Sequence, residues 1–365
     1  MRPEDEEQRV LEYLKRYAYQ SQSYSILRSD KSYFFSPSGI DGVIAYVVRA
    51  NVVLAAGDAV CDPCNLREFI AEFRQFCTAQ KWRCCFQAVT DRCMGILEEL
   101  GFGMIKIGEE PIFELGKLSW AGGKFKDLRN DSRSARKHGL TVVEYCPLAG
   151  RRPDWEKQME DLSAAWMKFK GSGEFAFMIG EPGLADPGER KYFLVLLADQ
   201  VEAFVVCTPV YARNGIYFDL MRRKEKTLRG TNQLLIAESF RLLKEQGYTM
   251  ATLGTAPLAS EHVDDPSQSR IIEMALNLAF DRLGYFHRYK PLYQFKVQFG
   301  PTSWEGRYLA FWPRRFNPVM LYALLKAYDP SGVTGQLLSQ IRHAWRGIKK
   351  LDQVPGNLLD RLKGR

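Results

Sequence analysis

The chain has 365 residues, 46% hydrophobic and 26% charged, an ordinary globular composition that allows two hydrophobic cores. Its net charge of +8 indicates an anionic partner but does not distinguish nucleic acid from a membrane surface. No run of about 18 apolar residues is present and residues 1–8 are acidic, so we expect no membrane span, no secretory signal and a cytoplasmic location.

The first 116 residues predict a compact α/β unit, because strands come first and helices then alternate with strands. The expected helices span residues 4–20, 65–80 and 91–100, and the expected strands 33–36, 42–50, 51–60, 83–89 and 104–115. Eight cysteines are expected to be reduced. Cys61 and Cys64 have the spacing of half a zinc site, but neither a second such pair nor a nearby histidine accompanies them, so no metal is expected.

Residues 117–139 form a basic segment that predicts a helix connecting two units. Its basic residues are Lys117, Lys124, Lys126, Arg129, Arg133, Arg136 and Lys137, against Asp127 and Asp131. Arg129, Arg133 and either Arg136 or Lys137 fall on one helical face. Two interpretations stay open, a solvated helix between domains and a surface that contacts phosphates.

Residues 140–312 repeat the order of the first unit and predict a second α/β domain. The expected helices span 154–169, 231 onward and 269–283, and the expected strands 140–145, 191–198, 201–211, 215–222, 249–254, 292–299 and 306–312. The Gly- and Pro-containing stretch 171–188 is long for a compact domain, which suits either a lid over an apolar substrate or a surface loop.

Residues 313–365 predict a basic, amphipathic helical tail. From Trp312 onward the chain carries ten Lys and Arg against three Asp. Helices are expected at 318–328 and 335–351, the second with apolar residues on one side and cations on the other. This pattern fits a helix on an anionic membrane surface and equally a helix packed on the protein with its cations in water.

The stretch from Asn214 to Ala237 carries the strongest chemical signal. An apolar strand contains one carboxylate, Asp219, and is followed by a basic loop that ends at Gly230-Thr231 and by a helix. A strand, a cationic loop and a helix N-terminus together form a site for an anion, since first-turn N–H groups lack partners within the helix.

Five motifs in fixed order extend this signal. They are Asp219-Leu220-Met221-Arg222, Arg229-Gly230-Thr231, Leu253 to Leu258, Phe295 to Phe299, and Trp304 to Leu309. Together with upstream motifs, over roughly residues 25–312, the chain resembles the soluble C-terminal domain of lysylphosphatidylglycerol synthases, also called multiple peptide resistance factors. The resemblance implies two tandem acetyltransferase-like (GNAT) domains and transfer of an aminoacyl group from aminoacyl-tRNA to a hydroxyl of a lipid such as phosphatidylglycerol.

The resemblance also implies partners. They are aminoacyl-tRNA, an anionic membrane lipid at the inner face of the membrane, and a separate membrane protein or flippase, since this chain has no expected span. A fragment of a longer membrane protein, or a free-standing relative with a sterol or peptide acceptor, stays open. The amino acid transferred and the oligomeric state do not follow from the sequence.

The resemblance assigns Asp219, Arg222 and Lys296 to the active site. Asp219 would orient the amino acid's ammonium group or accept the alcohol proton, while Arg222 and Lys296 would bind the lipid phosphate or the tRNA end. In a regular strand, positions 219 and 222 face opposite sides, so they cooperate only if the strand ends or twists between them. The structural alternatives are a buried ion pair for Asp219 with Arg222, and a Lys296 that snorkels at a sheet edge.

Two further sets are expected. Substrate binding is expected from Arg229, Gly230, Thr231, Arg307 and Tyr308, and tRNA binding from Lys124, Lys126, Arg129, Arg133, Arg136 and Lys137. The neighbours Glu109 and Glu110 would point to opposite faces of a strand, which disfavours a shared acid/base role.

No cofactor is expected. Acetyltransferases hold coenzyme A with Arg or Gln, two residues, Gly, one residue, then Gly or Ala, but Thr227 and Asn232 occupy the outer positions here. Rival functions are an acyl-CoA N-acetyltransferase and a non-catalytic RNA- or lipid-binding adaptor.

Overall fold

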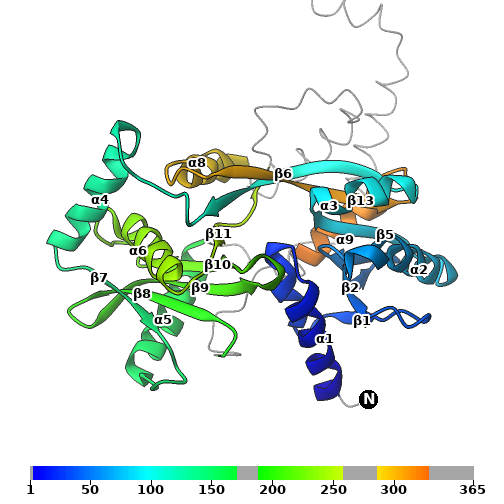
Figure 1. Cartoon of the computed structure of the whole chain (residues 1–365), viewed down its shortest axis with the longest axis horizontal. Helices are drawn as coiled ribbons and strands as arrows, with labels where there is room; N and C mark the ends of the chain where they lie inside the picture. The colour runs from blue at the N-terminus through cyan, green and yellow to red at the C-terminus, as the bar shows by residue number, and fades with distance from the viewer. Residues whose placement is uncertain (1–2, 171–187, 258–285, 329–365) are drawn as a thin grey trace, which may run out of the picture.

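The computed structural model describes residues 3–170, 188–257 and 286–328 (Figure 1). Within these ranges the fold is mixed α/β, built on one sheet of thirteen strands. The order of strands along the main path is β1-β2-β3-β5-β13-β6-β11-β10-β9-β8-β7, with β4 paired to β2 and β12 to β6. Helices pack on both faces of this sheet, so the apolar side chains that point to either face of the strands are buried.

The N-terminal half follows the predicted order closely. Its elements are α1 (Pro3–Tyr17), η1 (Ser21–Leu27), β1 (Ser32–Phe34), β2 (Gly42–Arg49), β3 (Val52–Ala56), β4 (Val60–Cys61), η2 (Pro63–Asn65), α2 (Leu66–Ala79), β5 (Arg83–Val89), α3 (Asp91–Glu99) and β6 (Gly103–Glu114). Phe69, Phe73 and Cys77, at helical spacing on α2, are fully buried against the sheet. Gly101 has φ +82° just past α3, the left-handed conformation expected where a helix ends at glycine.

The C-terminal half contains the remaining elements. They are η3 (Gly123–Phe125), α4 (Lys126–Lys137), β7 (Thr141–Tyr145), α5 (Pro153–Lys170), β8 (Lys191–Leu197), β9 (Gln200–Val210), η4 (Tyr211–Arg213), β10 (Gly215–Arg223), α6 (Thr231–Glu245), β11 (Met250–Thr252), β12 (Ala256–Pro257), α8 (Phe286–Val297), β13 (Ser303–Trp312) and α9 (Pro318–Tyr328). The predicted loop 171–188, except its last residue, and the predicted helices 269–283 and 335–351 lie outside the described residues.

The sheet does not follow the predicted division at residues 116 and 140. Strand β13, which the sequence placed in the second domain, lies between β5 and β6 and is antiparallel to both. Strand β6 in turn extends across the middle of the molecule, and its end pairs with β11 (Figure 1). Each half therefore completes its sheet with a strand from the other half of the sequence, a long-range exchange that local patterns do not encode.

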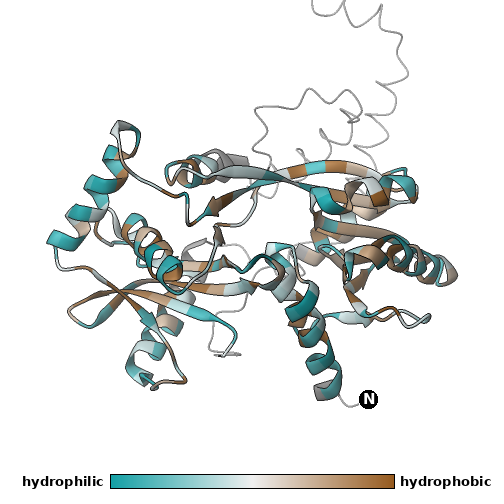
Figure 2. Ribbon diagram, viewed as in Figure 1, coloured by the Kyte–Doolittle hydropathy of each residue, from teal (hydrophilic) through white to brown (hydrophobic). Residues whose placement is uncertain are grey.

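The start of the predicted tail belongs to the core rather than to a membrane-facing surface. Helix α9 contacts β2 and β3, and Met320, Leu321 and Leu325 are almost completely buried there. Figure 2 shows α9 as largely apolar, in contrast to the hydrophilic α4. The helix predicted over 318–328 is confirmed, but this part of the predicted tail is apolar and buried rather than amphipathic. Within the described ranges, no helix combines the length and apolarity needed to cross a bilayer.

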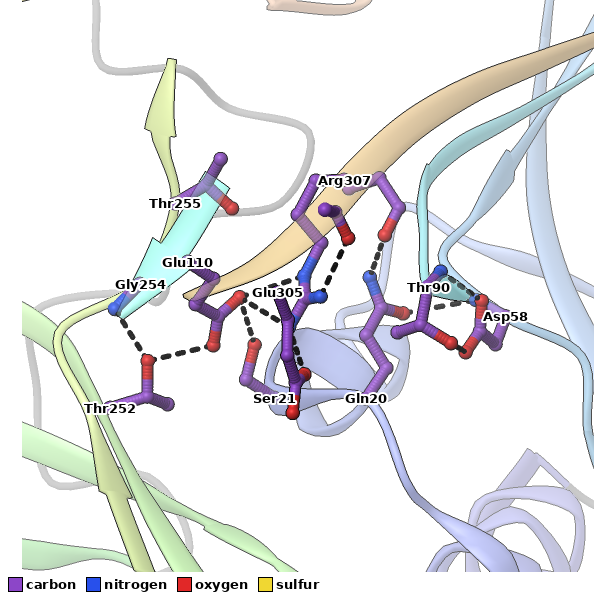
Figure 3. Close-up of polar contacts among 12 residues, drawn as sticks. Gln20, Ser21, Asp58, Thr90, Glu110, Thr252, Gly254, Thr255, Glu305 and Arg307 are labelled. Atoms are coloured by element: carbon purple, nitrogen blue, oxygen red, sulfur yellow. Dashed lines mark hydrogen bonds and ion pairs between the residues drawn. The ribbon is translucent and has the colours of Figure 1, made fainter. Parts of the chain in front are cut away.

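A buried ion pair joins β6 to β13 at the centre of the molecule (Figure 3). The Arg307 guanidinium lies 2.9 Å from Oε2 of Glu110, and both side chains are inaccessible to solvent. Ser21 of η1 donates to Glu110 at 2.9 Å and Thr252 of β11 donates to it at 2.8 Å. One carboxylate on β6 therefore collects hydrogen bonds from three other elements, and its hydrogen-bonding capacity is satisfied despite complete burial.

Breaking this pair should destabilise the whole chain. Arg307→Met leaves the Glu110 carboxylate buried without its cation, so the free energy of unfolding should fall by about 3–5 kcal/mol, measured by urea denaturation. The matched control is Arg67→Met, which breaks an ion pair with Glu99 whose side chains are 64% and 63% exposed and should change little. A loss below about 1 kcal/mol in Arg307→Met would show that the pair does not hold the sheet together.

Candidate functional site

The two central strands of the C-terminal half separate after three residue pairs. Strands β10 and β11 are parallel and pair from Gly215 with Met250 to Tyr217 with Thr252. Beyond that point β10 continues to Arg223 beside β9, whereas the chain after Thr252 leaves and pairs as β12 with β6, Ala256 opposite Glu109. We call this opening the split. Backbone groups that would pair across a continuous ladder need other partners here, so polar side chains are expected at the split.

Lys296 supplies one such partner. Its Nζ donates to the carbonyl oxygens of Gly254 at 2.7 Å and Thr255 at 2.8 Å, on the β11 side of the split. The side chain is only 4% exposed, and this burial lowers the pKa of Lys296 to about 7, with Glu110 acting in the opposite direction. Near neutral pH the amine is therefore partly deprotonated.

Lys296 lies on helix α8, not on the predicted strand 292–299. The alternation Phe295-Lys296-Val297-Gln298-Phe299 resembles a strand, but Phe295 and Phe299 are also four apart, and their rings contact each other with centroids 5.4 Å apart. Phe299 is fully buried in the core beneath α4 and α6. Tertiary packing of the two phenylalanines thus favours the helical spacing over the strand spacing.

Asp219 is the extra residue of a β-bulge. Phe218 pairs with Cys207 and Leu220 with Val206, so no residue of β9 lies opposite Asp219. Beyond the bulge the alternation shifts by one, which places Arg222 on the same face of the sheet as Tyr217. The bulge interrupts the regular alternation between positions 219 and 222. The Asp219 carboxylate is hydrogen-bonded to the Tyr217 hydroxyl.

Arg222 is buried against an aromatic ring. Its guanidinium lies 3.8 Å from the ring centroid of Trp166 on α5, and it is 5% exposed. Burial lowers the pKa of Arg222 to about 10, so the group stays charged at neutral pH. Beside Trp166, between α5 and the ends of β9 and β10, lies a cavity of about 660 Å³, within the size range of ligand sites.

The loop before α6 is arranged differently from the sequence expectation. Gly230 has φ +87°, and a Cβ there would lie 2.2 Å from the backbone oxygen of Asp131 on α4. The Thr231 hydroxyl donates to the Leu228 carbonyl at 2.6 Å, and Arg229, with its side chain 84% exposed, forms an ion pair with Asp131 at 3.0 Å. The glycine therefore makes room for α4 rather than for a ligand phosphate.

The cations of the basic segment are used in two ways. Arg129 donates to the carbonyls of Trp120 and Gly122, and Arg136 forms an ion pair with Glu238 on α6, so these two hold α4 in place. The other four members of the predicted tRNA-binding set are exposed: Lys124, Lys126, Arg133 and Lys137. Lys126, Arg133 and Lys137 share one face of α4 at helical spacing and present a cationic stripe to solvent.

Two predicted substrate residues lie away from the split. Arg307 is enclosed in its ion pair with Glu110, and Tyr308 packs in the aromatic core of the N-terminal half, hydrogen-bonded to Asp91. The sequence reasoning did not select Glu110, although a carboxylate before the apolar run Pro111 to Phe113 was a signal. It also did not select Tyr217. In the described ranges, no three His, Cys, Asp or Glu side chains gather as a metal site would require.

The corresponding opening in the N-terminal half is filled. Strands β3 and β5 are parallel up to Ala56 and Gln87, and the Gln20 side chain then bridges them, accepting from Asp58 N at 2.9 Å and donating to Ala88 O at 2.6 Å. The Asp58 carboxylate accepts from Thr90 N and Oγ1 (Figure 3). The chain's own side chains occupy this position, so the split of the C-terminal half is the stronger candidate.

Substituting Gly230 tests how closely α4 packs on α6. Gly230→Ala should lower the free energy of unfolding by about 1–3 kcal/mol more than Gly247→Ala, because its Cβ meets backbone. Gly247 has the same φ of +87° with nothing within 4 Å, so it isolates the conformational cost. Equal losses in urea denaturation would mean that the helices are not in contact at Gly230.

Comparison with known proteins gives consistent matches over most of the chain. A phosphatidylglycerol lysyltransferase from Bacillus subtilis is 25% identical over 83% of this chain, and a lysylphosphatidylglycerol biosynthesis bifunctional protein from Gordonia bronchialis is 27% identical over 82%. The chain spans only 34% and 26% of these relatives. The structure of L-PGS from Bacillus licheniformis shares the fold, with a TM-score of 0.74 and 21% identity, covering 91% of this chain and 96% of that one. The family described as phosphatidylglycerol lysyltransferase, C-terminal, matches residues 11–311, and the chain belongs to this family.

Proposed function

We propose that the protein transfers an aminoacyl group from aminoacyl-tRNA to a hydroxyl of an anionic lipid such as phosphatidylglycerol. The reaction exchanges one ester for another: the lipid hydroxyl attacks the ester carbonyl, its proton leaves, and the tRNA ribose oxygen departs with a proton. Such a reaction needs a base, a group that holds the amino acid, and cations for phosphates. The split offers one residue for each of these tasks.

Lys296 is the base, and this residue carries the proposal. A neutral amine has two N–H groups and one lone pair, and both N–H groups have acceptors in the carbonyls of Gly254 and Thr255. The lone pair then accepts the proton of the lipid hydroxyl, and the resulting ammonium returns it to the departing ribose oxygen. A pKa of about 7 suits both steps, because base and acid forms are both populated near neutral pH.

Asp219 and Arg222 bind the two substrates. The Asp219 carboxylate, outside the regular ladder, holds the ammonium group of the amino acid. Arg222 is charged and stacked on Trp166, which lines the 660 Å³ cavity together with Arg223 and Lys224, and it binds the lipid phosphate. This division follows from charge, because an aminoacyl ester presents a cation near its carbonyl and the lipid headgroup presents an anion.

The fold supports an acetyltransferase ancestry without an acetyltransferase cofactor. We infer two acetyltransferase-like units in tandem, because each half has a parallel strand pair that ends at a polar opening. Coenzyme A would need phosphate contacts at the loop before α6, where Gly230 is in contact with α4. An ester already activated on tRNA needs no such carrier, so the acyl-CoA alternative is disfavoured.

The exposed cations of α4 are proposed to bind the tRNA. Lys126, Arg133 and Lys137 form a stripe on a helix whose backbone touches the start of α6 at Gly230. Arg229 lies at the same junction and continues the positive charge toward β10. A phosphate backbone along this stripe would direct the aminoacyl end toward the split. We further propose a peripheral location at the inner membrane face and a separate membrane protein that moves the product.

Variants of Lys296 test whether this residue acts as a base or as a cation that binds phosphate. Labelled amino acid should appear in the lipid extract when charged tRNA, phosphatidylglycerol vesicles and enzyme are combined, and the rate should rise through pH 7 as Lys296 loses its proton. Lys296→Met and Lys296→Arg should both lose at least about 100-fold in rate. A Lys296→Arg enzyme with full activity would identify the residue as a phosphate-binding cation instead.

Stability provides an independent readout for Lys296. Its pKa is lowered from 10.5 to about 7 on folding, so between these values the unfolded chain binds a proton that the folded chain releases. The contribution of Lys296 to stability therefore rises with pH across that window. Lys296→Met should flatten the pH dependence of unfolding there.

The α4 stripe predicts salt-dependent tRNA binding. Arg133→Ala with Lys137→Ala should weaken binding and reduce the slope of log K against log salt by about 1.5, since two phosphate contacts are lost. Exchanging Arg67 and Arg83, two exposed arginines of the N-terminal half, for alanine is the charge-matched control and should leave the slope unchanged. Equal slopes for both double variants would place the tRNA elsewhere.

A further inference from the structure

Tyr217 occupies the point from which β10 and β11 part. It is the last residue of β10 that pairs with β11, it is 6% exposed, and it lies on the face that also carries Arg222. Its hydroxyl is hydrogen-bonded to the Asp219 carboxylate and to the Gln22 amide of η1. The phenol thus links a segment of the N-terminal half to the bulge residue of the C-terminal half.

The ring of Tyr217 has little freedom to move. A Cβ on Gly254 would lie 2.8 Å from the ring, so the absence of a side chain there is what admits it. Ile112, Val210 and Met250 pack around it in a small buried cluster. The hydroxyl is consequently held at one place, between its two polar partners.

The charges around the hydroxyl keep it a donor. Burial, Asp219 and Glu110 all raise the pKa of Tyr217 well above its usual value, whereas Gln22 acts in the opposite direction. Gly254 connects this residue to the candidate base: it lies against the Tyr217 ring, and its carbonyl accepts a hydrogen bond from Lys296. The phenol therefore keeps its proton at neutral pH and donates a hydrogen bond to the carboxylate.

Asp219 needs such a partner because of the bulge. No residue of β9 lies opposite it, so the strand register alone does not fix its side chain. We propose that Tyr217 is a positioning residue that holds the Asp219 carboxylate toward the split, and that Gln22 holds the Tyr217 hydroxyl in turn. This inference rests on the proposed role of Asp219 as the group that binds the amino acid's ammonium. It makes η1 of the N-terminal half a contributor to substrate recognition.

The test is Tyr217→Phe, which keeps the ring and removes the hydroxyl. KM for aminoacyl-tRNA should rise about 5- to 20-fold while kcat changes less than about 3-fold, because the ammonium contact weakens and the base is untouched. Gln22→Met should shift KM in the same direction by a smaller factor. Tyr46→Phe, a buried phenol of the N-terminal half, is the matched control and should leave KM unchanged.

A second background separates positioning from general packing. In Asp219→Asn enzyme, adding Tyr217→Phe should change KM by less than about 2-fold, because the charged group through which Tyr217 acts is gone. The same factor in both backgrounds, or a normal KM in Tyr217→Phe and Gln22→Met, would overturn the inference. Full activity of Asp219→Asn alone would instead refute the proposed role of Asp219. If Tyr217→Phe does not fold, Gln22→Met in the two backgrounds decides.

Discussion

The site depends on one constraint: β10 and β11 stay paired for only three residues. The continuation of β11 is drawn away because β6, which extends across the middle of the molecule, pairs with it first as β11 and then as β12. The backbone groups exposed by this separation are satisfied by Lys296 on one side, while β10 bulges at Asp219 on the other. The reactive side chains are thus a consequence of how the strand ladder is interrupted.

The central ion pair explains why β6 can take this path. A strand shared by two halves has to be fixed in register, and the Glu110 carboxylate is held by Arg307, Ser21 and Thr252 at once. Removing any one donor would leave a buried charge poorly satisfied, which penalises other arrangements of the strands. The two halves also differ from each other. Gln20 fills the opening between β3 and β5 in the N-terminal half, whereas the split between β10 and β11 remains available.

Local patterns predicted most helices and strands because their apolar spacing matches the faces they bury. The pattern singled out Asp219 as one carboxylate in an apolar strand, but its assignment to the active site came from the resemblance and stays a prediction. The failures are non-local. Phe295 and Phe299 fit two periods, and only the core beneath α6 decides for the helix that carries Lys296. The exchange of β13, the burial of α9 and the contact of Gly230 with α4 all depend on residues that are far apart in the sequence, so no local window contains them.

The central claim is that the Lys296 amine loses its proton near neutral pH, with both its neutral and charged forms populated there. An NMR titration of protein labelled at lysine Cε, compared with Lys296→Met to assign the signal, measures this directly. The Lys296 signal is predicted to titrate near pH 7. If it instead titrates near pH 10.5, the ordinary value for lysine, the amine is a permanent cation, and the assignment of a base at the split is contradicted.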